Sequence, residues 1–314
     1  MGCRRIHKSM HSYSSPLSNP LAPSWSQLYH FEYPPTGDFV GLESSEGARF
    51  YFPRQIIMHH SEVIRRCLDV LSQSGCVTIP FESTKKVLGQ LLDILDPAIV
   101  NPIIDPETIF DALLVADQYQ IWAVHSWFQQ EVITSRKNHL TGVETICLLY
   151  SDPLLVLRCC VRFKFKSVLP VAFHRVIGCH ISRLSTVSEL LEPWPQRVWD
   201  ERKRMSAFYS EFADELALWK GPRYISVVIT RPCSRHACRS ARAAWILALK
   251  RASREAPSWT AFQEEYLSAA DMCSVCGARF PTAYSNLYNK WEKRAEAKEL
   301  DLMERVAWDI YRQM

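Results

Sequence analysis

The chain has 314 residues, of which 47% are hydrophobic, 22% charged and 11% aromatic, and its formal net charge is +4. This composition excludes a mostly disordered protein, and 10 glycines are too few for a collagen-like or glycine-rich one. A charge of this size does not by itself indicate nucleic-acid binding. At roughly 150 residues per domain, the length predicts about two folded units.

The start of the chain predicts an intracellular protein of the cytoplasm or nucleus. The first ten residues are basic, but no apolar stretch follows them, so they do not form a secretory signal peptide. No window holds about 18 uninterrupted apolar residues, so we expect no membrane span and no membrane partner. Thiols stay reduced inside cells. The eleven cysteines, an odd number, therefore favour buried thiols or metal ligands over a disulfide framework.

Residues 1–30 are rich in Ser, Pro, Asn and His and show no hydrophobic periodicity, which predicts a disordered leader. Segments 38–43 and 48–52 then alternate in the manner of two strands of a β-hairpin. Pro53 opens a predicted helix, because proline is favoured at a first helical position. Apolar residues at three- and four-residue spacing carry this helix to Cys67.

Four further elements complete this first region. A short strand is expected at 77–79, and helices are expected at 84–95, from 105 onward, and at 121–132. The resulting order is strand, turn, strand, helix, short strand and three helices.

Three motifs give this order a family resemblance. They are Ser61-Glu62-Val63-Ile64, Val77-Thr78-Ile79-Pro80, and Leu113-x-x-Ala116-Asp117-x-Tyr119-x-Ile121. The chain resembles the BTB/POZ domain over residues 36–134, especially the divergent, shorter BTB domains of many fungal proteins. The resemblance implies an α+β fold in which a short sheet is flanked by helices. Many members open the first helix with His-Lys, but this chain has Pro53-Arg54, so the pocket built by that pair is not carried over.

BTB domains are protein-interaction modules, so the resemblance implies protein partners and a homo- or heterodimer formed through the N-terminal strand and first helix. It also implies that Asp117 and Tyr119 are scaffold residues. Some members recruit a cullin scaffold, for which residues 79–82 offer only a loose version of the motif. The apolar side chains around the first helix exceed what one buried face needs, which predicts the dimer interface. Those residues are Phe52, Ile56, Ile57 and Ile64. The alternative is a helix buried on two sides of a core.

The second half predicts a mainly helical region. A helical extension covers residues 140–220, and a Cys/Trp-rich module covers residues 221–314. Helices are expected at 154–163, 168–177, 199–219, 239–254, 260–270 and from 282 onward, with a short strand at 225–229.

Two cysteine pairs in the C-terminal module predict a structural zinc site. Cys233-x4-Cys238 and Cys273-x-x-Cys276-Gly277 would supply four sulfurs from loops at helix ends, and His236 could replace one of them. Unliganded buried thiols and a redox disulfide remain alternatives. The other cysteines are expected to be core or near-core thiols, apart from one in the leader. They are Cys67, Cys76, Cys147, Cys159, Cys160, Cys179 and Cys3.

Between Arg231 and Ala256, seven Lys and Arg residues stand against one Glu. This excess suggests an alternative function, a zinc-stabilised nucleic-acid-binding or transcription-regulatory protein. The solvated face of a helix explains the same charges more simply, so nucleic acid is not an expected partner.

The sequence lacks the common catalytic motifs, including a glycine-rich phosphate loop, Gly-x-Ser-x-Gly and His-Glu-x-x-His. We therefore expect no enzyme. The predicted function is a protein–protein interaction module that dimerises through its BTB-like domain and presents or recruits partner proteins. A cullin ubiquitin-ligase substrate adaptor is a further alternative.

Overall fold

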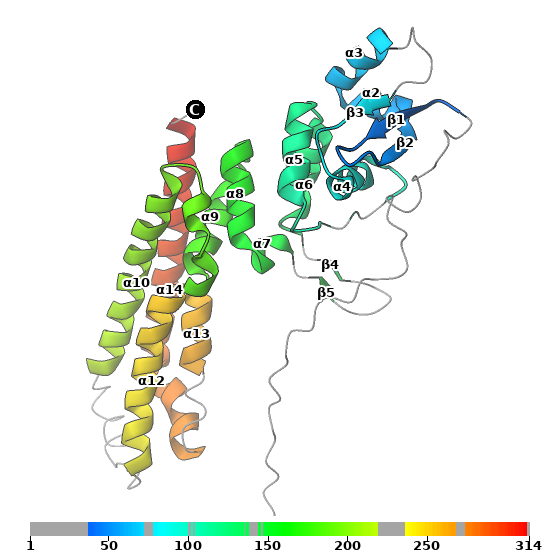
Figure 1. The fold of residues 1–314 in the computed structure, drawn as a ribbon. Coiled ribbons are helices and arrows are strands. Elements are labelled where there is room, and N and C mark those ends of the chain that lie inside the picture. Colours follow the sequence, from blue (N-terminus) through cyan, green and yellow to red (C-terminus); the bar gives the residue numbers. More distant parts are fainter. Residues whose placement is uncertain are drawn as a thin grey trace, which may run out of the picture. The chain divides into compact units, whose positions relative to one another are not determined.

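A computed structural model describes most of the chain, in two compact units (Figure 1). The described residues are 37–71, 78–99, 102, 104–134, 136–137, 144–145, 147–218, 236–267 and 274–312. Within them, the side chains of 136–137, 144–145, 236–242, 274–286 and 310–312 are not described. The first unit contains the described residues up to 102 together with 115–120, and the second contains 104–114 and the described residues from 121 on.

A three-stranded sheet of order β2-β1-β3 forms the centre of the first unit. Its strands are β1 (Phe39–Glu43), β2 (Arg49–Pro53) and β3 (Thr78–Pro80). Strand β1 runs antiparallel to β2 and parallel to β3, with Gly41 opposite Tyr51 on one side and Thr78 on the other. A Cβ at Gly41 would lie 2.8 Å from Thr78 Oγ1, so glycine allows this close approach. The predicted hairpin and third strand are confirmed.

The first helix is interrupted, which the sequence did not predict. It consists of α2 (Arg54–His60) and α3 (Glu62–Leu71), separated by Ser61 in an extended conformation with φ −140° and ψ 113°. The Ser61 hydroxyl accepts a hydrogen bond from Ile64 N at 3.0 Å, so this serine caps α3. The expectation of one continuous helix to Cys67 is therefore wrong, because the side chain of Ser61 competes for the backbone.

Helix α4 (Lys85–Leu95) follows β3, and its N-cap Thr84 accepts from Val87 N at 3.3 Å. Helix α5 (Ile109–Gln118) is divided between the two units. The core of the first unit lies between the sheet and the helices. Its buried side chains include Val40, Leu42, Phe50, Phe52, Ile57, Ile64, Leu68, Ile79, Phe81, Leu88, Leu91 and Leu92.

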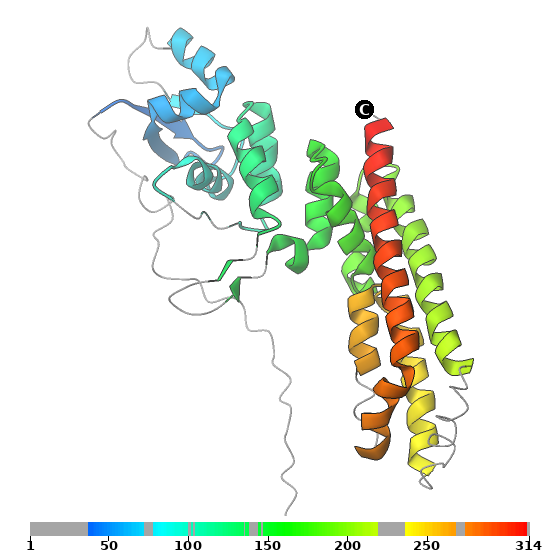
Figure 2. The same cartoon turned by 180° about the vertical axis from the view of Figure 1, so that it is seen from behind.

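The second unit is a helical assembly with one two-residue β-ladder among its described residues (Figures 1 and 2). Its helices are α6 (Trp122–Glu131), α7 (Leu148–Ser151), α8 (Pro153–Phe163), α9 (Leu169–Gly178), η2 (Ile181–Leu184), η3 (Val187–Glu189), α10 (Trp194–Leu218), α12 (His236–Glu255), α13 (Trp259–Leu267) and α14 (Ser274–Arg312); the ladder pairs β4 (Arg136–Lys137) with β5 (Glu144–Thr145). The predicted helices are present, and the α+β class is confirmed. In the part of the chain that the structure describes, no helix has the length and apolar character needed to cross a membrane.

Two helices begin earlier than expected. Helix α10 starts at Trp194 rather than at 199. Pro193 and Pro195 are compatible with this start, because the first N–H groups of a helix have no partner within the helix and proline lacks only that group. Helix α14 starts at Ser274 rather than at 282. The predicted strand at 225–229 lies outside the described residues.

Aromatic side chains fill the core between α10, α13 and α14. Phe212 stacks on Phe262 and on Trp291, with ring centroids 4.8 Å apart in each pair. Trp259 and Tyr209 also stack on Phe262, with ring centroids 6.2 and 5.7 Å away. This packing explains why most of the tryptophans lie in the second half of the chain.

Candidate functional site

The predicted interface residues lie in the first unit, and most of them are covered by their own chain. Phe52 is 1% exposed, and Ile57 and Ile64 are fully buried, whereas Ile56 is half-buried. These apolar side chains are therefore buried in the core of a single copy. This agrees with the alternative, a helix that is buried on two sides. Only Ile56 among the four retains surface that a partner could reach.

The BTB-like motifs converge on one another in what we call the motif junction, which consists of Ser61, Pro80, Phe81 and Tyr119. The Ser61 hydroxyl donates to Tyr119 O at 2.5 Å, and the Tyr119 hydroxyl donates to Pro80 O at 3.0 Å. The Tyr119 ring stacks on Phe81 with centroids 4.2 Å apart. Burial, with the nearby Glu82 and Cys67, raises the pKa of Tyr119, so its hydroxyl keeps its proton. Tyr119 therefore links the segment of Ser61 to that of Pro80 and Phe81.

The side chains of the four predicted metal ligands are not among those that the structure describes. Cys233 and Cys273 lie outside the described residues, and the side chains of Cys238 and Cys276 are not described. Cys238 and Cys276 are each the third residue of a helix, α12 and α14 respectively. The expectation that both pairs stand wholly in loops is thus wrong for these two. Among the described residues, no group of three or more His, Cys, Asp or Glu side chains could hold a metal ion.

The described cysteines outside these pairs behave as core thiols. Cys147, Cys159 and Cys160 are buried, and Cys67 and Cys179 are half-buried, all as free thiols. Burial raises the pKa of Cys159 to about 12 and that of Cys160 well above its usual value. These two side chains are therefore protonated and poor nucleophiles or ligands.

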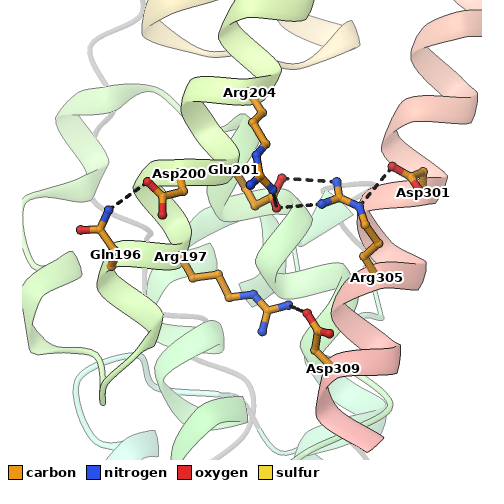
Figure 3. A network of polar contacts seen from close by, with 8 residues as sticks. All are labelled: Gln196, Arg197, Asp200, Glu201, Arg204, Asp301, Arg305 and Asp309. Carbon is orange, nitrogen blue, oxygen red and sulfur yellow. Dashed lines mark hydrogen bonds and ion pairs between the residues drawn. The ribbon is translucent and has the colours of Figure 1, made fainter. Parts of the chain in front are cut away.

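A polar network that the sequence analysis did not anticipate joins α10 to α14 (Figure 3). Glu201 accepts from Arg204 at 2.6 Å and from both terminal nitrogens of Arg305 at 2.9 and 3.3 Å. Arg305 also contacts Asp301 at 3.2 Å. Burial alone would lower the pKa of Arg305, but its carboxylate partners outweigh burial and raise it. Arg197 pairs with Asp309 in the same network.

We call this line of contact the α10–α14 seam, and two hollows lie along it. The first has a volume of about 770 Å³, and its lining includes Pro193, Gln196, Arg197, Asp200, Glu201, Arg204, Arg305, Trp308 and Asp309. The second has a volume of about 630 Å³ and is lined by Arg204, Ala207, Phe208, Glu211, Arg294, Ala297, Lys298 and Asp301. They share Arg204 and so form one continuous surface.

A half-buried carboxylate anchors α14 further along the seam. Glu299 accepts from the Tyr209 hydroxyl at 2.7 Å and from Trp259 N at 3.0 Å, and His174 lies 3.3 Å away. Burial acts to raise the pKa of Glu299, but these three contacts outweigh it and lower the pKa. Four helical segments therefore meet at one ionised side chain.

Both oxygens of Glu201 accept from arginines, which commits this carboxylate to ion pairs rather than to proton abstraction. The signal in the sequence for this polar network was the four-residue spacing of opposite charges. Arg197 and Glu201 have this spacing on one helix, and Arg305 and Asp309 have it on another.

Comparison with known proteins does not assign this chain to a family. No protein-family model, no curated protein and no solved structure matches this chain.

Proposed function

We propose that the chain is a protein–protein interaction protein whose first unit is a BTB/POZ-like scaffold for self-association and partner recruitment. The observation that carries this proposal is the motif junction. Ser61 and Tyr119 are 58 residues apart, and Tyr119 and Pro80 are 39 apart, yet each pair is hydrogen-bonded. The residues that carry the family resemblance thus depend on one another, as the parts of one fold would. The strand–helix order agrees with the same resemblance.

The first unit also offers apolar surface close to the first helix. Ile56 is half-buried on α2, while Val70 and Leu71 on α3 are 75% and 37% exposed. Neighbouring exposed apolar side chains mark contact surfaces more often than isolated ones do. We therefore propose that α2 and α3 supply the contact face for self-association, with Ile56 as the residue retained from the predicted interface.

Sedimentation equilibrium on the intact chain tests this proposal. We expect the double variant Ile56→Asp/Val70→Asp to weaken self-association, because it places charge on the contact face. The control is Ile133→Asp, which changes a residue that is 52% exposed in the second unit. A wild-type chain that stays monomeric, or a double variant that associates as the wild type does, would contradict the proposal.

A structural zinc ion remains part of the proposal, held by Cys233, Cys238, Cys273 and Cys276. Two of these residues lie in the first turns of α12 and α14, so an ion shared by both pairs would tie two helix starts together. Elemental analysis should find about one zinc per chain, and a chelator should reduce the helical circular dichroism. The control, Cys67→Ser, should keep its zinc. A zinc content far below one equivalent, together with a circular dichroism spectrum that the chelator does not change, would contradict the proposed zinc site.

We place this activity in the cytoplasm or nucleus. All five cysteines whose side chains are described, which include three in the core, are free thiols. Free thiols are typical of proteins from reducing compartments.

A further inference from the structure

The smaller hollow of the α10–α14 seam has walls of matching pattern. Helix α10 contributes Arg204, Ala207, Phe208 and Glu211, and helix α14 contributes Arg294, Ala297, Lys298 and Asp301. Each set follows the spacing i, i+3, i+4, i+7, which is one face of a helix. Each face begins with an arginine, carries an alanine in its middle and ends with a carboxylate.

The two helices run antiparallel, so the pattern has approximate two-fold symmetry. Contacts across the seam pair rising numbers on α10 with falling numbers on α14. They are Arg197–Asp309, Glu201–Arg305, Tyr209–Glu299 and Glu215–Trp291. Arg204 and Asp301 therefore lie at one end of the hollow, and Glu211 and Arg294 lie at the other. Each end presents one positive and one negative charge.

We propose that the α10–α14 seam is a self-association surface, on which a second copy of this chain lays its own seam. A two-fold axis parallel to the helices would put α10 of each copy over α14 of the other. Arg204 would then face Asp301 of the second copy, and Glu211 would face Arg294 of the second copy. A two-fold interface requires such self-complementarity, because each contact occurs twice.

These residues keep exposed surface that a second copy could reach, although Arg204 also pairs with Glu201 and Asp301 with Arg305 within the chain. The side chain of Arg204 is 62% exposed and that of Asp301 is 53% exposed, and Glu211 and Arg294 are exposed as well. The guanidinium of Arg294 lies 4.0 Å from the centroid of the Trp291 ring, which holds it in place before a partner arrives.

The centre and one end of the seam supply the packing for such a dimer. Ala207 and Ala297 are both exposed, and small side chains let helices approach closely. Trp308, at the larger hollow, is 67% exposed. In the proposed arrangement it would lie over α10 of the second copy near Arg197, where an indole can stack on arginine.

The size of the surface sets the expected strength. The lining residues extend over about 25 Å along the helices at 1.5 Å per residue, and two neighbouring helices are about 20 Å wide. The footprint is then about 500 Å² per copy, or about 1,000 Å² in total, which is the lower limit for a specific interface. The seam therefore predicts a weak, reversible dimer.

Mixing two charge variants tests the proposal on the intact chain. In Arg294→Glu alone, the introduced carboxylate would face Glu211 of an identical copy, and in Glu211→Arg alone, two guanidinium groups would meet. Sedimentation equilibrium should show each variant associating about tenfold more weakly than the wild type. In an equimolar mixture both contacts again join opposite charges, so association should return close to the wild-type strength. The matched control is Arg251→Glu, an exposed arginine on α12, which should neither weaken association nor rescue Glu211→Arg.

Rescue in the mixture requires contact between copies, since neither variant can restore its own charge pairing. Three results would overturn the proposal: a mixture no tighter than the separate variants, equal association in all samples, or a wild-type chain that stays monomeric. Association through the first unit alone would give the second of these results. That outcome would be consistent with the proposed function but would contradict self-association through the α10–α14 seam.

Discussion

Replacing Arg202 by methionine should destabilise the second unit more than any change on its surface. The Arg202 residue is 4% exposed on α10, and its guanidinium donates to Ile177 O and Cys179 O at 2.7 Å each. It also donates to Glu255 O at 2.5 Å and to Arg254 O at 3.4 Å. These carbonyls end α9 and α12, where helices have unpaired acceptors and partial negative charge. One side chain therefore closes two helix ends.

The magnitude follows from the number of contacts. Hydrogen bonds to a charged group contribute about 1.5–3 kcal/mol each, and water would replace part of them once the guanidinium is gone. We expect Arg202→Met to lower the free energy of unfolding by about 3–5 kcal/mol. Arg202→Lys should lower the free energy of unfolding by about half as much, because one ammonium group cannot reach both helix ends as the planar guanidinium group does.

Urea unfolding followed by tryptophan fluorescence measures this effect, since every described tryptophan lies in the second unit. Arg204→Met is the matched control, because its side chain lies on the same helix, is 62% exposed and makes an ion pair worth about 1 kcal/mol or less. A loss below about 1 kcal/mol for Arg202→Met would refute the reasoning.

Three more predictions each concern one side chain or one charged segment. Ser61→Ala should cost about 1–3 kcal/mol of first-unit stability in thermal unfolding, against less than about 0.5 kcal/mol for the exposed Ser188→Ala, because it removes both a helix cap and the bond to Tyr119. Glu299 has a lowered pKa in the folded chain, so its stabilisation is complete above its usual pKa near 4.5 and is lost as pH falls through the lower folded value. Glu299→Gln should therefore flatten the acid limb of a stability–pH curve, and an unchanged limb would contradict this. Fluorescence anisotropy should show no salt-dependent binding of duplex DNA, since Lys250 of the basic segment already pairs with Asp214.

Local sequence patterns predicted the strands and most helices of the first unit. The turn between 38–43 and 48–52 marked the hairpin, and Thr84 marked the start of a helix whose apolar face is buried as its spacing predicted. The break at Ser61 was missed because apolar spacing continues through it. The carbonyl of Tyr119, which holds the serine hydroxyl, comes from a part of the chain that local spacing cannot place.

The seam could not have been predicted in the same way. Arg197 and Glu201 read as a solvated helix face, and so do Arg305 and Asp309, until α10 and α14 are known to be antiparallel neighbours. The apolar surplus at Ile57 and Ile64 was misleading for a related reason. Sequence spacing shows that a side chain will be buried, but it does not show whether its own chain or a second copy buries it.

The central claim, that this chain is an interaction protein that self-associates through its first unit, is tested most directly by affinity capture of the intact protein with cross-linking mass spectrometry. We expect a tagged copy of the chain to recover an untagged second copy in near-equal amount, with cross-links that join residues around α2 and α3 of the two copies. The same capture with Ile56→Asp/Val70→Asp should lose the second copy, whereas Ile133→Asp should keep it. Recovery of no second copy in comparable amount, or equal recovery by both variants, would contradict the claim.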